Sequence, residues 1–123
     1  MEFKFEKLII WQKAMEFGEA INKLALKFPK EETYSLTSQI RRAAVSVPCN
    51  IAEGYGRKTT PEYIRFLYIA YGSNCELETQ ILLSGDLGYI EAGELKKLQN
   101  GIGEVERMLK ALIKSLENKP LNP

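Results

Sequence analysis

The residues best suited to chemistry recur along one predicted helix, between Leu36 and Arg57. They stand three or four positions apart and therefore share one flank of the helix. This polar stripe consists of Gln39, Arg42, Ser46, Asn50, Glu53 and Arg57. Glu53 and Arg57, four residues apart, have the spacing of an ion pair along a helix.

The cations of this segment suit two different partners. Guanidinium and ammonium groups contact phosphates in nucleic acids. They could equally bridge to the acidic segment 59–94, which holds six acidic residues and one basic residue, or to another subunit. The cations are Arg41, Arg42, Arg57 and Lys58.

The sequence contains no histidine, which removes the commonest general base and the commonest metal ligand. Catalytic triads built on histidine are excluded, and Glu53, Glu76 and Glu78 cannot form the Glu-x-x-His pairs of a di-iron bundle. No glycine-rich phosphate loop, nucleophile elbow or Cys-x-x-Cys motif is present. We therefore expect no enzymatic activity, no cofactor and no metal site.

The chain has the composition of a globular protein, with 123 residues, 45% of them hydrophobic. It has no apolar run of about 18 residues and no signal-peptide pattern, so we expect a cytoplasmic protein with no membrane partner. In a reducing compartment, Cys49 and Cys75 are expected to be small buried hydrophobic residues. A disulfide or a metal site is the alternative.

Four apolar stripes at helical spacing predict four helices, over roughly residues 6–28, 36–57, 60–84 and 95–116. Residues typical of helix ends lie at the three predicted connections: Pro29 with a Ser35 or Thr37 cap, Gly54 and Gly56 with a Thr59 cap, Pro61 and Glu62, and the turn at 85–89. The stripes are Ile10, Ala14, Phe17, Ile21, Leu24 and Phe28; Leu36, Ile40, Ala43, Ala44, Val47, Ile51 and Gly54; Tyr63, Leu67, Ala70, Asn74, Leu77 and Ile81; and Leu95, Leu98, Ile102, Val105, Leu109, Leu112 and Leu116.

Short turns between long helices are typical of an all-α, up-down-up-down antiparallel four-helix bundle. Pro48 falls inside the second helix, so we expect a kink there. The bundle should form a single domain over residues 1–118, with a frayed tail at 119–123.

Two of the predicted helices carry a second apolar face. A helix that serves one core needs one apolar face, so a second face predicts burial against another copy of the chain. The predicted oligomer interface consists of Val45, Pro48, Ala52, Ile64, Tyr68 and Cys75. Asn74 adds a polar residue to a core stripe; it either fixes helix register together with the polar stripe or lines a ligand pocket.

The net charge is only +1, but segment 23–58 holds seven basic and three acidic residues. Such a distribution favours contact between subunits over strong nucleic-acid binding. If nucleic acid is bound, we expect weak, salt-sensitive contacts to phosphate. The candidate binding residues are Arg41, Lys58, Lys96, Lys97, Arg107, Lys110 and Lys114.

Several motifs resemble a bacterial family of short four-helix-bundle proteins encoded in intervening sequences of 23S rRNA genes, also called S23 ribosomal proteins. The longest is the segment 36–48, LTSQIRRAAVSVP, followed by Asn50-Ile51-Ala52-Glu53-Gly54. The resemblance continues in segment 62–67, EYIRFL, and at Glu76-Leu77-Glu78-Thr79. It implies a bundle that assembles into a ring of five, with no known catalysis. A related branch, which includes the accessory variability protein of diversity-generating retroelements, binds nucleic acid and partners a reverse transcriptase.

Together these features predict a non-enzymatic, homopentameric scaffold with weak contacts to RNA, DNA or a nucleic-acid-processing protein. Two alternatives stay open: a protein-binding scaffold without nucleic-acid contact, and a bundle that binds a small ligand.

Overall fold

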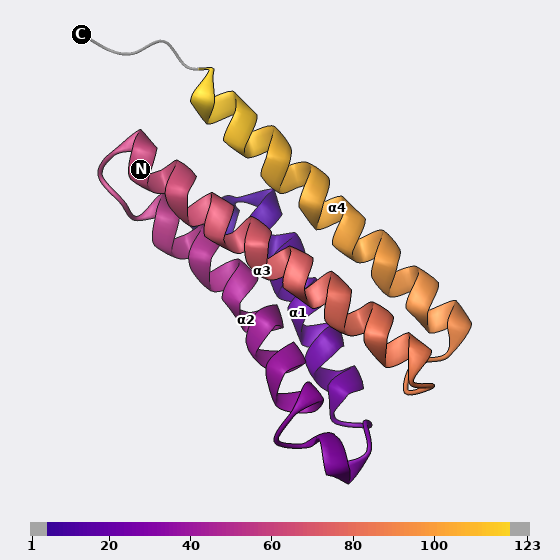
Figure 1. Ribbon diagram of the computed structural model, residues 1–123. Coiled ribbons are helices and arrows are strands. Elements are labelled where there is room, and N and C mark those ends of the chain that lie inside the picture. The colour runs from indigo at the N-terminus through magenta and orange to yellow at the C-terminus, as the bar shows by residue number, and fades with distance from the viewer. Residues whose placement is uncertain (1–4, 119–123) are drawn as a thin grey trace, which may run out of the picture.

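A computed structural model describes residues 5–118, which form an all-α, four-helix bundle (Figure 1). No strand occurs within this range. The long helices are α1 (Ile9–Ala25), α2 (Leu36–Tyr55), α3 (Thr60–Asp86) and α4 (Ala92–Glu117). Two short 3-10 helices, η1 (Phe5–Lys7) and η2 (Lys30–Glu32), precede α1 and α2. The four-helix prediction is confirmed, whereas the predicted tail at 119–123 lies outside the described residues.

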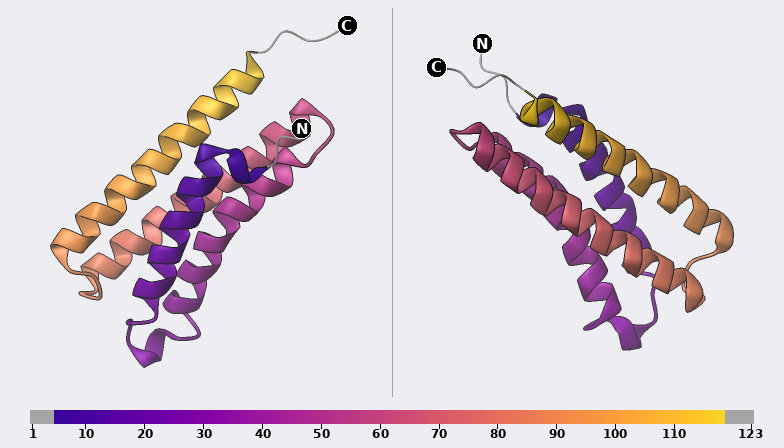
Figure 2. Two further views of the ribbon diagram at one scale, coloured as in Figure 1. Left: turned by 180° about the vertical axis from the view of Figure 1, so that it is seen from behind. Right: turned by 45° about the horizontal axis from the view of Figure 1, so that its top comes forward.

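The chain reverses direction between successive helices (Figure 1). α2 packs extensively on both α1 and α3, and α3 packs on α4, whereas α1 and α4 share fewer contacts (Figure 2). The start of α1, the α2–α3 connection and the end of α4 lie at one end of the bundle (Figure 1). The η2 segment and the α3–α4 connection lie at the other end.

The core runs the length of the bundle in two clusters. One contains Ile21, Ile40 and Ile81, and the other contains Ile51, Leu67 and Leu109. The predicted stripes supply most of these residues. In α4 the last core position is Ile113, whereas Leu112 and Leu116 are only partly buried.

The prediction that the cysteines are buried is wrong, because Cys49 and Cys75 are both exposed. Val47 and Ile51 take the core positions of α2, and Cys49 between them faces the opposite side of the helix. Cys75 likewise follows the buried Asn74 and lies about 100° further round α3.

The two predicted N-terminal caps differ in outcome. Thr59 caps α3: the backbone N–H of Glu62 donates to Thr59 Oγ1 at 3.3 Å, and Pro61 occupies the first turn. Ser35 precedes α2 but makes no side-chain cap. Its hydroxyl instead donates to Glu32 Oε1 at 2.7 Å, which ties η2 to the start of α2.

α2 and α3 are in close contact at Gly54, which is buried. A Cβ atom at this position would lie 2.8 Å from Cβ of Phe66 and 3.1 Å from Cδ1 of Tyr63. The glycine therefore sets how near the two helices can come. Pro48 is also buried within α2, and the predicted kink there stays a prediction.

Alanine in place of a helical glycine changes both the packing and the helix propensity. Substitutions at two glycines separate these two effects on the free energy of unfolding. Gly54→Ala should lower the free energy of unfolding by about 1–3 kcal/mol, because overpacking outweighs the better helix propensity. Gly93→Ala, in the first turn of α4, should raise it by about 0.5–1 kcal/mol, because the added Cβ makes only an ordinary contact, 3.7 Å from Glu91 Oε1. Urea unfolding at one protein concentration measures both. Equal effects of the two substitutions would contradict the close approach at Gly54.

One hydrogen bond joins the two connections at the η2 end. Tyr89, after α3, donates its hydroxyl to Glu32 Oε2 at 2.8 Å, and its ring lies 5.5 Å from that of Phe28. The bond to Glu32 raises the pKa of Tyr89. The hydrogen bond from Ser35, followed by that from Tyr89, lowers the pKa of Glu32 below its usual value of 4.5.

Because of this hydrogen bond, the free energy of unfolding depends on pH. A lowered pKa in the folded state means that the ionised Glu32 stabilises the fold above pH 4.5, and that this contribution is lost as the pH falls through the lowered value. Tyr89→Phe should therefore lower the urea midpoint near neutral pH, and the difference from wild type should shrink on acidification. A difference that is independent of pH would show that the Tyr89 hydroxyl acts through something other than ionised Glu32.

Candidate functional site

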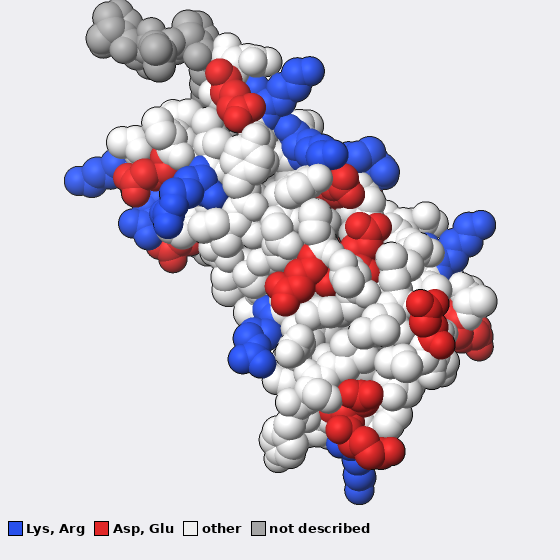
Figure 3. Space-filling model, viewed as in Figure 1, with Lys and Arg blue, Asp and Glu red and all other residues white. Residues whose placement is uncertain are grey.

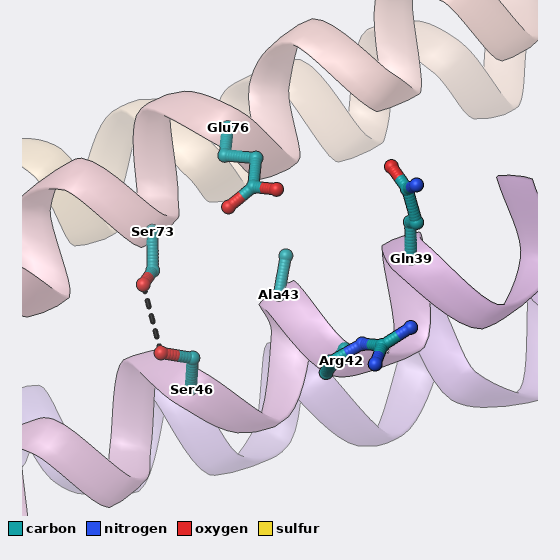
Figure 4. Close-up of a pocket in the computed structure, with 6 residues that line it drawn as sticks. All are labelled: Gln39, Arg42, Ala43, Ser46, Ser73 and Glu76. Atoms are coloured by element: carbon teal, nitrogen blue, oxygen red, sulfur yellow. Dashed lines mark hydrogen bonds between the residues drawn. The ribbon is translucent and has the colours of Figure 1, made fainter.

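The first half of the polar stripe lines a cleft between α2 and α3 (Figure 4). The cleft encloses about 480 Å³. Ser46 Oγ lies 2.8 Å from Ser73 Oγ, and this hydrogen bond joins the two helices at one end of the cleft. The lining residues are Gln39, Arg42, Ala43, Ser46, Ser73 and Glu76.

The cleft holds one cation and one anion that do not pair with each other. Arg42 donates to Ser38 Oγ at 3.0 Å, and Glu76 Oε2 accepts from Gln80 Nε2 at 3.4 Å. Within residues 5–118, neither Arg42 nor Glu76 belongs to an ion pair of 4.0 Å or less. Figure 4 shows Glu76 extending from α3 into the space beside Arg42 and Gln39 of α2.

The rest of the polar stripe has partners in α2, in the connection that follows it and in α3. Asn50 Nδ2 donates to the Ser46 carbonyl at 2.9 Å and to Ser46 Oγ at 3.0 Å. Glu53 and Arg57 form an ion pair at 2.9 Å, and the Arg57 guanidinium lies 4.6 Å from the centre of the Phe66 ring. The charged residues of the second half of the stripe therefore pair with each other, whereas Arg42 in the first half is bonded to Ser38 and has no anionic partner within residues 5–118.

Asn74 lies apart from this stripe. It is buried, and its Nδ2 donates to the Ile102 carbonyl at 3.2 Å, so it joins α3 to α4. Sequence reasoning missed Ser73 as a lining residue and considered Glu76 only as a metal ligand. Ser73 and Glu76 are three residues apart on α3, so the sequence places them on one face of that helix. It does not show that this face lies against α2.

The candidate nucleic-acid residues do not form one patch. At 100° per residue, Lys96, Arg107, Lys110 and Lys114 share a face of α4, and this basic stripe extends over roughly 27 Å. Lys97 lies about 100° away from this face, and Lys58 follows α2 at one end of the bundle. Arg41 lies on the α1 side of α2, where it donates to Asn22 Oδ1 at 2.9 Å.

Acidic residues interrupt the basic stripe. Lys110 pairs with Glu106 at 3.1 Å, which is the main cause of the raised pKa of Lys110. Its ammonium also lies 5.5 Å from the Tyr71 ring centre. Figure 3 shows basic and acidic side chains interspersed on the face that it presents. The arrangement suits weak contact with phosphate better than tight binding.

The predicted interface residues of α2 line an apolar groove against α1, of about 380 Å³. Val45 is 50% exposed, and Pro48 and Ala52 form part of the floor with Trp11 and Met15 of α1. We call this the α1/α2 groove.

The predicted interface residues of α3 differ in exposure. Tyr68 is 50% exposed and Cys75 is exposed, whereas Ile64 is partly buried against the core. The exposed face of α3 continues beyond Cys75 to Leu82 and Leu83.

No set of three or more potential metal ligands occurs within the part of the chain that the structure describes. Across the same residues, no helix is both long and apolar enough to cross a membrane.

The fold and polar cleft define a small helical-bundle protein, and comparison with known proteins gives its family. The family model for the 23S rRNA-intervening sequence protein matches residues 6–111. The chain therefore belongs to the family of 23S rRNA-intervening sequence proteins.

A solved structure supports the same assignment. The chain is similar to a crystal structure of a Bacteroides thetaiotaomicron protein of unknown function from the S23 ribosomal protein family. The TM-score is 0.81 at 25% identity, over 86% of this chain and 96% of that one. No curated protein matches the chain significantly.

Proposed function

We propose that this protein is a non-catalytic scaffold that assembles from copies of itself. The exposed face of α3 between residues 68 and 83 carries the proposal. It has one charged residue, Glu76, at its edge, whereas a solvated helix face is normally rich in charge. The exposed residues are Tyr68, Ile69, Gly72, Cys75, Glu76, Thr79, Leu82 and Leu83.

The α1/α2 groove supplies a second apolar surface. A helix face on one copy and a groove on the next make a head-to-tail contact, which closes into a ring or continues as a filament. A ring of five is the number that the family resemblance implies. The lack of histidine, and with it of the usual acid–base and metal chemistry, supports the non-catalytic part of the proposal.

Two substitutions test the head-to-tail contact. Val45→Glu in the groove and Leu83→Glu on the α3 face should each reduce the assembly to monomers, because each buries a charge in an apolar contact. Leu26→Glu, at a leucine that is 67% exposed after α1 and outside the groove, should leave the assembly unchanged. Sedimentation velocity measures the masses.

Mixing the two monomeric variants makes the test specific. Val45→Glu keeps an intact α3 face and Leu83→Glu keeps an intact groove, so an equimolar mixture can form one native contact and should sediment as a dimer. A wild-type protein that is monomeric at micromolar concentration would end the proposal. A mixture that stays monomeric would contradict the pairing of these two surfaces.

The basic stripe on α4 favours a second role, weak binding of nucleic acid. Ring assembly would repeat the stripe in each copy, and multivalency would strengthen contacts that are weak singly. In the cytoplasm, such an assembly would hold RNA, DNA or a protein that processes them.

Charge reversal tests this second role. Lys114→Glu on the stripe should weaken binding of RNA and DNA alike, because phosphate contacts carry little sequence information. Lys27→Glu, between α1 and α2 at the η2 end, is the matched control and should have little effect. Filter binding across a salt series should show retention at low salt and its loss near physiological salt. Failure to retain RNA or DNA at low salt would leave a protein-binding scaffold.

A further inference from the structure

Apart from Glu76 at the edge of the α3 face, no residue of the polar cleft between α2 and α3 belongs to the head-to-tail contact or to the basic stripe. We propose that it binds a guanine base. The argument starts from the two charged groups that line it. Arg42 and Glu76 enter the same space from facing helices, yet neither has an oppositely charged partner within residues 5–118 (Figure 4).

Each of the two charged side chains is hydrogen-bonded within its own helix and not to the other. The Ser46–Ser73 hydrogen bond joins α2 to α3 at one end of the cleft. Arg42 is turned along α2 toward Ser38, and Glu76 is turned along α3 toward Gln80. A ligand between them can therefore meet a cationic donor on one wall and an anionic acceptor on the other.

Gln80 provides an independent indication of a missing partner. This residue is only 7% exposed, and its Oε1 has no hydrogen-bond partner. Its Nε2 contacts Glu76, so the unpaired amide oxygen belongs to the group that supports the acidic wall of the cleft. Buried polar atoms without a partner are rare and often mark a place where water or a ligand binds.

Guanine has the pattern of donors and acceptors that these groups require. Its O6 and N7 accept two hydrogen bonds from an arginine, and its N2 amino group is a donor. The adjacent N1–H is a second donor, so the carboxylate of Glu76 can accept from N1 and N2 together.

The other bases fit the cleft less well. Adenine has an acceptor at N1, which would face the carboxylate with no proton between them. Cytosine offers one amino group to Glu76, and uracil offers a single N–H between two carbonyl oxygens. Serines and glutamine, which both donate and accept, line the remainder of the cleft and do not discriminate among bases.

The guanine could belong to a free nucleotide or to a single-stranded RNA, whose unstacked bases expose both edges. The RNA source rests on the proposed nucleic-acid role, and the free nucleotide does not. Titration calorimetry on the assembled protein with GMP and AMP tests the cleft alone. The RNAs AAAGAAA and AAAAAAA test the other source.

We expect GMP, the guanine-containing RNA or both to bind at least about tenfold more tightly than the adenine counterpart. Glu76→Gln should abolish this preference, because the amide offers one acceptor atom where guanine presents two donors. Glu78→Gln makes the same chemical change two residues along α3, outside the cleft, and should keep the preference. Circular dichroism and sedimentation check that both variants fold and assemble.

The outcomes separate the proposals. Preference for GMP alone assigns the cleft to a free nucleotide, and preference in RNA alone assigns it to a strand. RNA binding without guanine preference, together with no selective GMP binding, would overturn the cleft proposal and leave the nucleic-acid role standing. A preference that survives in Glu76→Gln, or no binding of any of the four ligands, would also overturn it.

Discussion

The close packing of α2 against α3 is the constraint on which the rest of the molecule depends. Gly54 lets the two helices touch at one end, and the Ser46–Ser73 hydrogen bond joins them near the middle. Beyond that bond lies the polar cleft with Arg42 and Glu76 on its walls. With its inner side occupied by α2, α4 and the core, α3 presents its nearly uncharged face outward.

Sequence patterns predicted what depends on neighbours along one helix. Helical spacing predicted the four helices and most of the core. Thr59 was predicted as a cap, and the four-residue spacing of Glu53 and Arg57 predicted their ion pair. Features that depend on how two helices face each other were not predicted. The cysteines are exposed because larger neighbours occupy the core, and the cleft became visible only when Ser73 and Glu76 were placed against α2.

Two kinds of surface suit the proposed scaffold. The α1/α2 groove and the α3 face are apolar and suit contacts that hold copies together, whereas the cleft and the α4 stripe are polar and suit ligands. Repetition in a ring would present every cleft and stripe several times, so weak individual sites would act together.

The central claim is that another copy covers the exposed face of α3, and the reactivity of Cys75 tests it directly. This thiol is exposed in the single chain and lies within that face. Alkylation of Cys75, followed by mass spectrometry of the peptide that contains it, should slow markedly as protein concentration rises through assembly. In monomeric Leu83→Glu the rate should stay fast at every concentration. Equal, fast alkylation of Cys75 in the assembled and monomeric proteins would contradict the account.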